Sequence, residues 1–87
     1  LMRQIGVTAE ARFGQIKELR LAANLRSCRI ILANPSDQII ETSLRLTGLW
    51  GLSLVVGGRT IPAANGGFEV PVTLLGRSEV VIEAEAR

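Results

Sequence analysis

The sequence contains no histidine and no tyrosine, and it contains only one cysteine, Cys28. Without histidine the chain cannot build a Ser-His-Asp or Cys-His nucleophile system. One cysteine and no histidine cannot supply the tetrahedral ligand set of a zinc site, and no disulfide can form within the chain. No glycine-rich phosphate loop of the G-x-x-x-x-G-K-[ST] type is present. The sequence therefore predicts a non-enzyme, with no catalytic residue, no cofactor and no metal.

Cys28 lies in an apolar run, where a free cysteine usually behaves as a small buried hydrophobe. A single cysteine also fits a reducing compartment better than a secreted setting, so we predict a cytoplasmic location. The chain opens with Leu1 before Met2. The length of 87 residues predicts a single domain, 1–87. The Leu-Met order predicts that this domain is a fragment of a larger protein.

Aromatic residues make up 3% of the chain, and the formal net charge is +2. The basic residues are scattered from Arg3 to Arg87, whereas a nucleic-acid binder more often clusters them and interleaves aromatics. The longest nearly uncharged stretch, 46–58, is shorter than the ~20 apolar residues that cross a bilayer. We therefore expect neither a nucleic-acid partner nor a membrane.

Two segments near the middle of the chain alternate with period two, as half-buried strands do. The positions expected to face inward are Cys28, Ile30 and Leu32 in the first segment and Ile40, Thr42, Leu44 and Leu46 in the second. The tetrad Asn34-Pro35-Ser36-Asp37 between them predicts a hairpin turn, because Asn34 can cap a turn and Pro35 presets its φ. The oxygens of Asn34, Ser36, Asp37 and Glu41 also allow a calcium interpretation, but calcium prefers six to eight oxygens.

Further strands are expected towards the C terminus, separated by turns rich in glycine. Their inward faces are predicted to carry Leu52, Leu54 and Val56, then Phe68, Val70, Val72 and Leu74, then Val80, Ile82 and Ala84. Gly57-Gly58 predicts a two-residue hairpin turn. Pro62 and Pro71 cannot donate to a ladder, which places their strands at sheet edges or bulges.

Glu83 and Glu85 share the outer face of the last predicted strand. A carboxylate pair could serve as acid and base in glycoside hydrolysis. On a face with this solvated pattern, we interpret the pair as a charged surface that keeps the strand soluble.

The first third of the chain allows two interpretations. Residues 9–26 suit a short helix with Phe13, Ile16, Leu19 and Ala23 on one stripe. They also suit two strands, with Ile5, Val7, Ala9 and Ala11 on one phase, followed by Leu19 and Leu21. A sandwich needs partners for the later strands, which favours strands. The expected fold is an all-β antiparallel β-sandwich, immunoglobulin-like or related.

Trp50 is the residue most suggestive of an interaction, because aromatic side chains are amphipathic anchors at interfaces. Between two glycine-flanked turns, it is expected to fill one end of the core or to meet another domain. Together with Arg45 or Arg59 it would form the contacts of a carbohydrate-binding module.

Four segments in order carry a family resemblance: a strand ending in NPSD, then IIETSLRLTG, then LSLVVGGRTIP, then GGFEVPVTLLGRSEVVIEA. Over residues 27–86 this order resembles the C-terminal β-sandwich domains of large glycoside hydrolases, with family 38 α-mannosidases most similar. The resemblance implies a non-catalytic accessory domain that packs against and stabilises the catalytic domain of the parent chain. The alternatives are a free-standing, homo-oligomerising interaction module and a carbohydrate-binding module.

Overall fold

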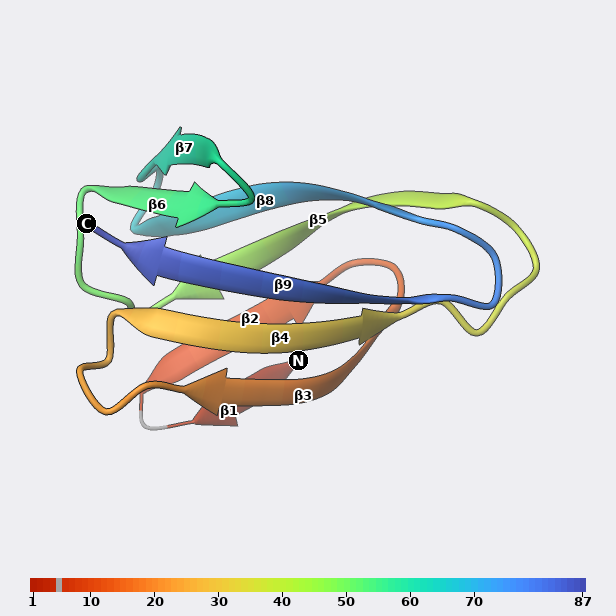
Figure 1. The fold of residues 1–87 in the computed structure, drawn as a ribbon, viewed down its shortest axis with the longest axis horizontal. Coiled ribbons are helices and arrows are strands. Elements are labelled where there is room, and N and C mark those ends of the chain that lie inside the picture. Colours follow the sequence, from red (N-terminus) through yellow and green to blue (C-terminus); the bar gives the residue numbers. More distant parts are fainter. Residues whose placement is uncertain (5) are drawn as a thin grey trace.

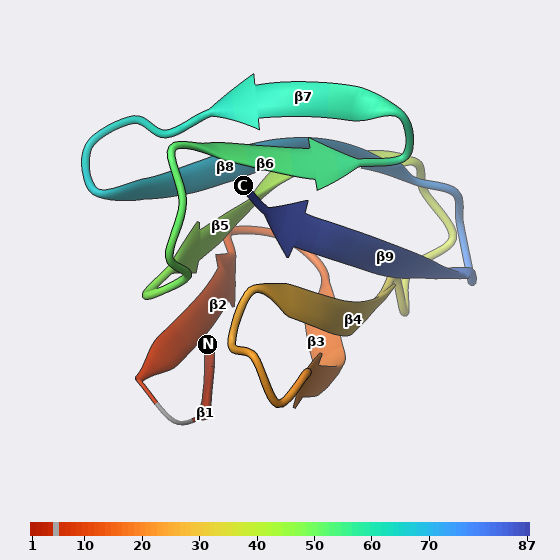
Figure 2. The same cartoon turned by 60° about the vertical axis from the view of Figure 1, so that its left-hand side comes forward.

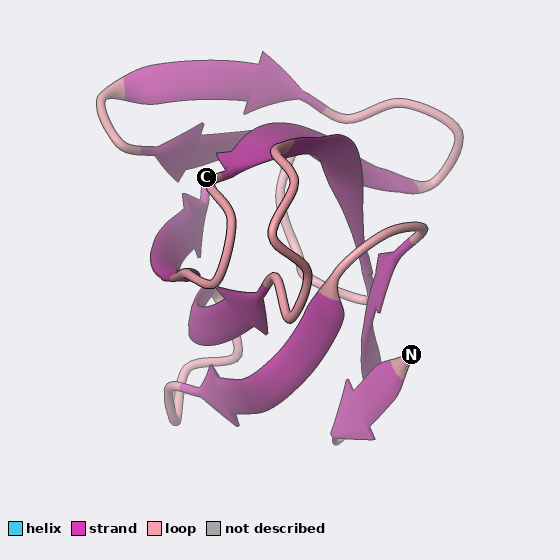
Figure 3. Cartoon of the chain, turned by 90° about the vertical axis from the view of Figure 1, so that its right-hand side faces the viewer, coloured by secondary structure: helices cyan, strands magenta, loops and turns pink. Residues whose placement is uncertain are grey.

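The computed structural model describes residues 1–4 and 6–87, and its regular elements are strands (Figure 3). They are β1 (Met2–Gln4), β2 (Val7–Ala11), β3 (Gln15–Leu21), β4 (Ser27–Ala33), β5 (Ile40–Thr47), β6 (Ser53–Val56), β7 (Arg59–Pro62), β8 (Gly67–Leu74) and β9 (Glu79–Ala86). They form a four-stranded sheet in the order β1-β2-β5-β8 and a five-stranded sheet in the order β3-β4-β9-β6-β7. Figures 1 and 2 show the two sheets as stacked layers. The predicted antiparallel β-sandwich is confirmed.

One apolar core lies between the sheets, because alternate side chains of each strand point inward. Its largest fully buried side chains are Phe68, Ile30, Leu32, Leu44, Leu46, Leu54, Leu74, Val7 and Val70. Seven of these nine side chains come from β4, β5 and β8, where the alternation predicted them to face inward. The other two are Val7 of β2 and Leu54 of β6. Burial of this apolar surface is the main force that holds the two sheets together.

The helix interpretation of residues 9–26 is wrong. Val7 and Ala9 are buried in β2, Leu19 is buried in β3, and β3 pairs with β4 in a hairpin. Pairing and burial therefore override the helical propensity of this Ala-, Leu- and Glu-rich segment. The predicted position of Ile5 on the same face lies outside the described residues.

The hairpin interpretation of the tetrad 34–37 is also wrong. β4 pairs with β3 and β9, whereas β5 pairs with β2 and β8, so the chain crosses from one sheet to the other between them. The capping role of Asn34 is confirmed, because its Oδ1 accepts a hydrogen bond from the Ser36 backbone N–H at 3.0 Å. Alternation along a strand reports which face is buried, and it does not report which strand comes next in the sheet.

The Gly57-Gly58 hairpin is confirmed. Val56 pairs with Arg59 across this turn, and the two glycines have φ of 55° and 80°, as a two-residue primed turn requires. The edge positions of both prolines are confirmed as well, since Pro62 ends β7 and Pro71 lies in β8, and each of these strands is the last in its sheet.

Two loops meet at one end of the sandwich, on the right in Figure 1. They are residues 34–39, between β4 and β5, and residues 75–78, between β8 and β9; we call them together the loop clamp. The Arg77 backbone N–H donates to the Ser36 carbonyl at 2.8 Å, and the Arg77 guanidinium pairs with Asp37 at 2.7 Å. The clamp therefore ties together the two connections that pass between the sheets at this end.

Candidate functional site

Trp50 lies in the loop between β5 and β6 with 77% of its surface exposed, and Leu52 in the same loop is 86% exposed. The prediction that Trp50 fills the core is wrong, and so is the inward position predicted for Leu52. Leu49 takes the buried position instead. The strand phase ends at Gly48, whose φ of 92° turns the chain, so Leu49 points in and Trp50 is left outside.

Arg45 lies on the outer face of the four-stranded sheet. The strand register places it directly between Glu10 of β2 and Glu69 of β8. Its guanidinium pairs with the Glu69 carboxylate at 3.2 Å and donates to the Asn65 carbonyl at 2.7 Å. Arg45 therefore has a structural role, because it connects the loop between β7 and β8 to the sheet.

Arg59 begins β7 in the other sheet, and its guanidinium donates to the Pro71 carbonyl at 3.4 Å. It lines a hollow whose other side chains come mostly from β8 and β9, whereas Arg45 lines a different hollow and Trp50 lines neither. The structure thus places the three predicted contact residues on separate surfaces.

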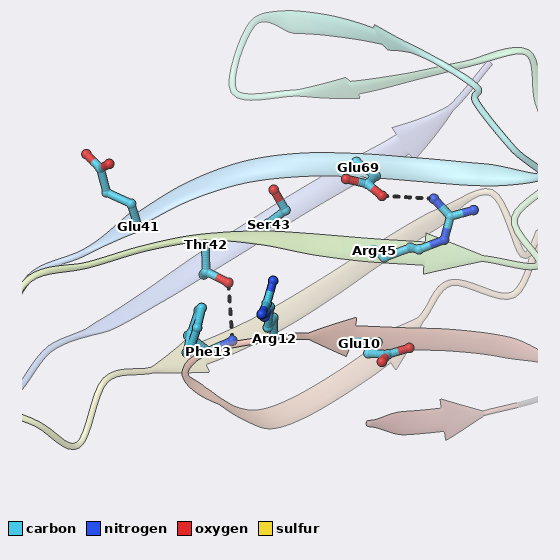
Figure 4. A pocket seen from close by; sticks show the side chains of 8 residues that line it. All are labelled: Glu10, Arg12, Phe13, Glu41, Thr42, Ser43, Arg45 and Glu69. Carbon is cyan, nitrogen blue, oxygen red and sulfur yellow. Dashed lines mark hydrogen bonds and ion pairs between the residues drawn. The ribbon is translucent and has the colours of Figure 1, made fainter.

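The hollow beside Arg45 has a volume of about 630 Å³ and opens onto the outer face of the four-stranded sheet (Figure 4). It is lined by Glu10, Arg12, Phe13, Glu41, Thr42, Ser43, Arg45 and Glu69, and we call it the sheet hollow. Strands β2, β5 and β8 supply most of these side chains, and the bend after β2 supplies Arg12 and Phe13.

The bend at one rim of the sheet hollow is fixed by local contacts. The Phe13 backbone N–H donates to the Thr42 hydroxyl at 3.3 Å, and the Arg12 guanidinium lies 5.4 Å from the centre of the Phe13 ring. A cation at this distance from an aromatic ring is attracted to it. The sheet hollow therefore combines carboxylate acceptors, guanidinium donors, hydroxyl groups and one half-exposed ring.

Among these eight side chains, sequence reasoning named Arg45 as a possible ligand contact and Glu41 as a possible calcium ligand, and it missed the other six. The signal was present in the polar alternation of Glu41, Ser43 and Arg45, but the strands that flank them could not be known without the pairing. Phe13 was interpreted as part of a helical stripe, whereas the structure places it at the rim with 51% of its surface exposed.

The four side chains of the calcium interpretation do not converge on one point, although the Ser36 hydroxyl donates to Asn34 Oδ1 at 2.7 Å. Asn34 is buried and uses its side chain within the loop clamp, Asp37 pairs with Arg77, and Glu41 lines the sheet hollow. Among residues 1–4 and 6–87, no group of three or more His, Cys, Asp or Glu side chains is placed to hold a metal ion.

Glu83 and Glu85 both lie on the exposed outer face of β9, as predicted. Glu83 is 3.9 Å from the Arg29 guanidinium, and Glu85 is 2.8 Å from the Arg87 guanidinium. Each carboxylate thus has an arginine partner, and Arg29 also pairs with Glu18 at 3.4 Å. This arrangement agrees with a solvated, charged surface.

Cys28 is buried in β4, as predicted, and desolvation by the surrounding protein raises the pKa of its thiol from 9.0 to about 11. The thiolate is the reactive form of cysteine, and a raised pKa lowers its population. We therefore expect a thiol reagent to react with Cys28 slowly in the native protein at pH 8 and rapidly after unfolding. The unfolded thiol ionises at lower pH than the folded thiol, so this group should weaken stability as the pH rises from about 9 to 11. Rapid modification of Cys28 in the native protein at pH 8, measured by absorbance, would contradict the expected slow reaction.

A scan against protein-family models found no match to this chain, and searches of curated proteins and of solved structures found no significant match either. The resemblance to the C-terminal domains of family 38 α-mannosidases stays a prediction. In the part of the chain that the structure describes, no helix has the length and apolar character needed to cross a membrane.

Proposed function

We propose that this chain is a non-catalytic β-sandwich accessory domain that packs against the catalytic domain of a carbohydrate-active enzyme and stabilises it. The observation that carries the proposal is the exposed pair Trp50 and Leu52, with 77% and 86% of their surfaces accessible. Contiguous exposed apolar surface marks interaction sites, and Trp50 and Leu52 lie two residues apart in the same loop. The partner class, an α-mannosidase-like glycoside hydrolase, is supported by the sequence resemblance over residues 27–86.

The loop that carries this pair is well fixed. The backbone N–H groups of Leu52 and Ser53 donate to the Arg87 carbonyl at 2.8 and 3.0 Å, and Arg87 N–H donates to the Ser53 carbonyl at 2.8 Å. A Cβ atom on Gly51 would lie 2.8 Å from the Arg87 backbone nitrogen, so the loop packs closely on the end of the chain. A surface fixed in this way loses little conformational entropy on binding, and tryptophan is a frequent centre of binding energy.

The outer strands favour docking through this loop over association by strand pairing. Two of them carry proline, Pro62 in β7 and Pro71 in β8. β3 contains an irregularity between Ile16 and Glu18, next to the exposed Lys17, and β1 spans only Met2–Gln4. Prolines, bulges, charged side chains and short strands all hinder the addition of another strand.

The alternative is a homo-oligomer that buries the same pair against a second copy. A carbohydrate-binding module built from Trp50, Arg45 and Arg59 receives less support, because these residues lie on separate surfaces. We also propose a cytoplasmic location, which agrees with the burial of the free Cys28 thiol.

The double substitution Trp50→Ser and Leu52→Ser should change the unfolding free energy of the isolated chain by no more than about 0.5 kcal/mol, because both side chains are exposed. In the parent polypeptide it should lower the melting temperature of the catalytic domain by removing the contact. The matched control is Leu75→Ser, an exposed leucine in the loop clamp. If Leu75→Ser lowered the melting temperature of the catalytic domain as much as the double substitution does, a specific role of the loop that carries Trp50 would be contradicted.

The first experiment is an immunoblot of source-cell extract, combined with sedimentation of the isolated 9.4 kDa chain. A native polypeptide far larger than the chain, with a monomeric isolated chain, would support the accessory-domain proposal. A native polypeptide near 9.4 kDa would overturn it. A dimer that Trp50→Ser dissociates would favour the homo-oligomer.

A further inference from the structure

We propose that the sheet hollow binds a neutral oligosaccharide, with the Phe13 ring as its stacking surface. Binding in the sheet hollow does not depend on docking through the loop between β5 and β6, because Trp50 and Leu52 do not line the hollow. Domain docking through Trp50 and Leu52 and sugar binding in the sheet hollow can therefore be tested separately.

The arrangement of charges favours a ligand that both donates and accepts hydrogen bonds. Arg45 lies between Glu10 and Glu69 in the strand register, so acceptors flank a donor across three neighbouring strands. The Cβ atoms of side chains directly opposite on such strands are about 5 Å apart, so one small ligand can reach side chains of all three strands. A hydroxyl group can donate to a carboxylate and accept from a guanidinium, so a polyol matches such a row.

A ligand of a single charge sign fits less well. The lining contains the three carboxylates of Glu10, Glu41 and Glu69 and the two guanidinium groups of Arg12 and Arg45. An anion would meet the carboxylates and a cation would meet the guanidinium groups, and like charges at close range destabilise a complex. A neutral ligand avoids both penalties and leaves the Arg45–Glu69 pair intact.

Phe13 supplies the apolar contact that a sugar needs besides hydrogen bonds. An aromatic ring packs well on an apolar face, and a pyranose presents such a face of C–H groups. Phe13 is 51% exposed, so its ring is accessible, and its backbone is held by the bond to Thr42. Figure 4 shows Phe13 and Arg12 side by side at the end of β2, next to β5.

The shape of the hollow agrees with an extended ligand. Its volume of about 630 Å³ lies within the usual range of ligand sites. Glu41, Ser43 and Arg45 follow one another on the same face of β5, which gives the hollow a long axis along the strand. Several sugar units could lie along this direction.

The test is a titration of the ¹⁵N-labelled chain with neutral tri- to hexasaccharides of mannose, glucose and xylose, followed by amide chemical shifts. We expect saturable shifts in β2, β5 and β8 around the sheet hollow, with a Kd on the order of 1 mM for the best ligand. Phe13→Ala should raise this Kd about three- to tenfold, whereas Phe13→Trp should preserve binding. Phe13 is half-exposed, so both variants should stay folded, and their amide spectra can confirm this.

The control is Trp50→Ala, which should leave the Kd unchanged. Three results would overturn the proposal: no saturable shift with any of these sugars, shifts centred on Trp50, or a Phe13→Ala variant that binds as well as the parent. Saturable shifts that about 0.5 M salt abolishes would also overturn it, because they would indicate recognition of charge.

Discussion

Replacing Asn34 with alanine is expected to lower the free energy of unfolding by about 3 kcal/mol. Asn34 is only 2% exposed, and its amide nitrogen donates to the carbonyls of Gln38, Leu74 and Leu75 at 2.6, 3.3 and 3.1 Å. Alanine would leave these buried or half-buried carbonyls without their donor and would remove the cap on Ser36. For a domain of this length the loss is a large part of the total stability.

The matched control for this variant is Asn24→Ala. The Oδ1 of Asn24 also accepts a backbone hydrogen bond two residues on, from Arg26 N–H at 2.9 Å, but Asn24 lies in an exposed turn. Water can replace that bond, so the loss should stay at or below about 1 kcal/mol. Equal losses for the two variants in urea denaturation would show that the buried network of Asn34 adds no stability.

Gly76→Ala is expected to destabilise the protein by about 3 kcal/mol. A Cβ atom on Gly76 would overlap the carbonyl oxygen of Asp37 and lie 2.7 Å from the carbonyl carbon. Because both are backbone atoms, the two loops of the clamp would have to separate, which would strain the bond from Arg77 N–H to the Ser36 carbonyl. Thermal unfolding followed by circular dichroism would measure the effect.

The control here is Gly66→Ala. Gly66 has a φ of 79°, but a Cβ atom there would meet nothing within 4 Å, so only the backbone conformation is unfavourable and the loss should be about 1 kcal/mol. Whether Gly76→Ala lowers or raises the free energy of unfolding is informative as well. Its φ is not among the positive values, and in open space an alanine there would stabilise the protein slightly by restricting the unfolded chain. A Gly76→Ala variant more stable than the parent would therefore contradict the close packing of the clamp.

Strand positions could be predicted well because the alternation of apolar and polar residues is a local property of the sequence, and every strand turns its apolar side to the same core. β4, β5, β8 and β9 each place their predicted apolar phase towards the interior. Glycine and proline marked the turn at Gly57-Gly58 and the edge positions of Pro62 and Pro71, since these residues restrict the backbone directly.

The connection through residues 34–37 could not be predicted, because a turn and a crossover use the same polar residues. Which strand lies beside β4 depends on β9, which follows more than forty residues later in the chain. The sheet hollow was missed for the same reason, since Glu10, Arg45 and Glu69 become neighbours only through the pairing of β2, β5 and β8. Trp50 was misplaced because hydrophobicity predicts burial on average, while Gly48 changes the direction of the chain just before it.

The loop clamp also bears on how long the folded state persists. Its ion pair joins Asp37 and Arg77, which are 40 positions apart in the sequence. Closing so long a segment loses chain entropy before any contact forms, and contacts of this kind make sandwiches slow to fold. We therefore expect the clamp to close after the rate-limiting step of folding. In stopped-flow experiments Asn34→Ala would then unfold much faster than the parent while folding at a similar rate, so that the clamp determines the lifetime of the native state and has little influence on how fast that state is reached.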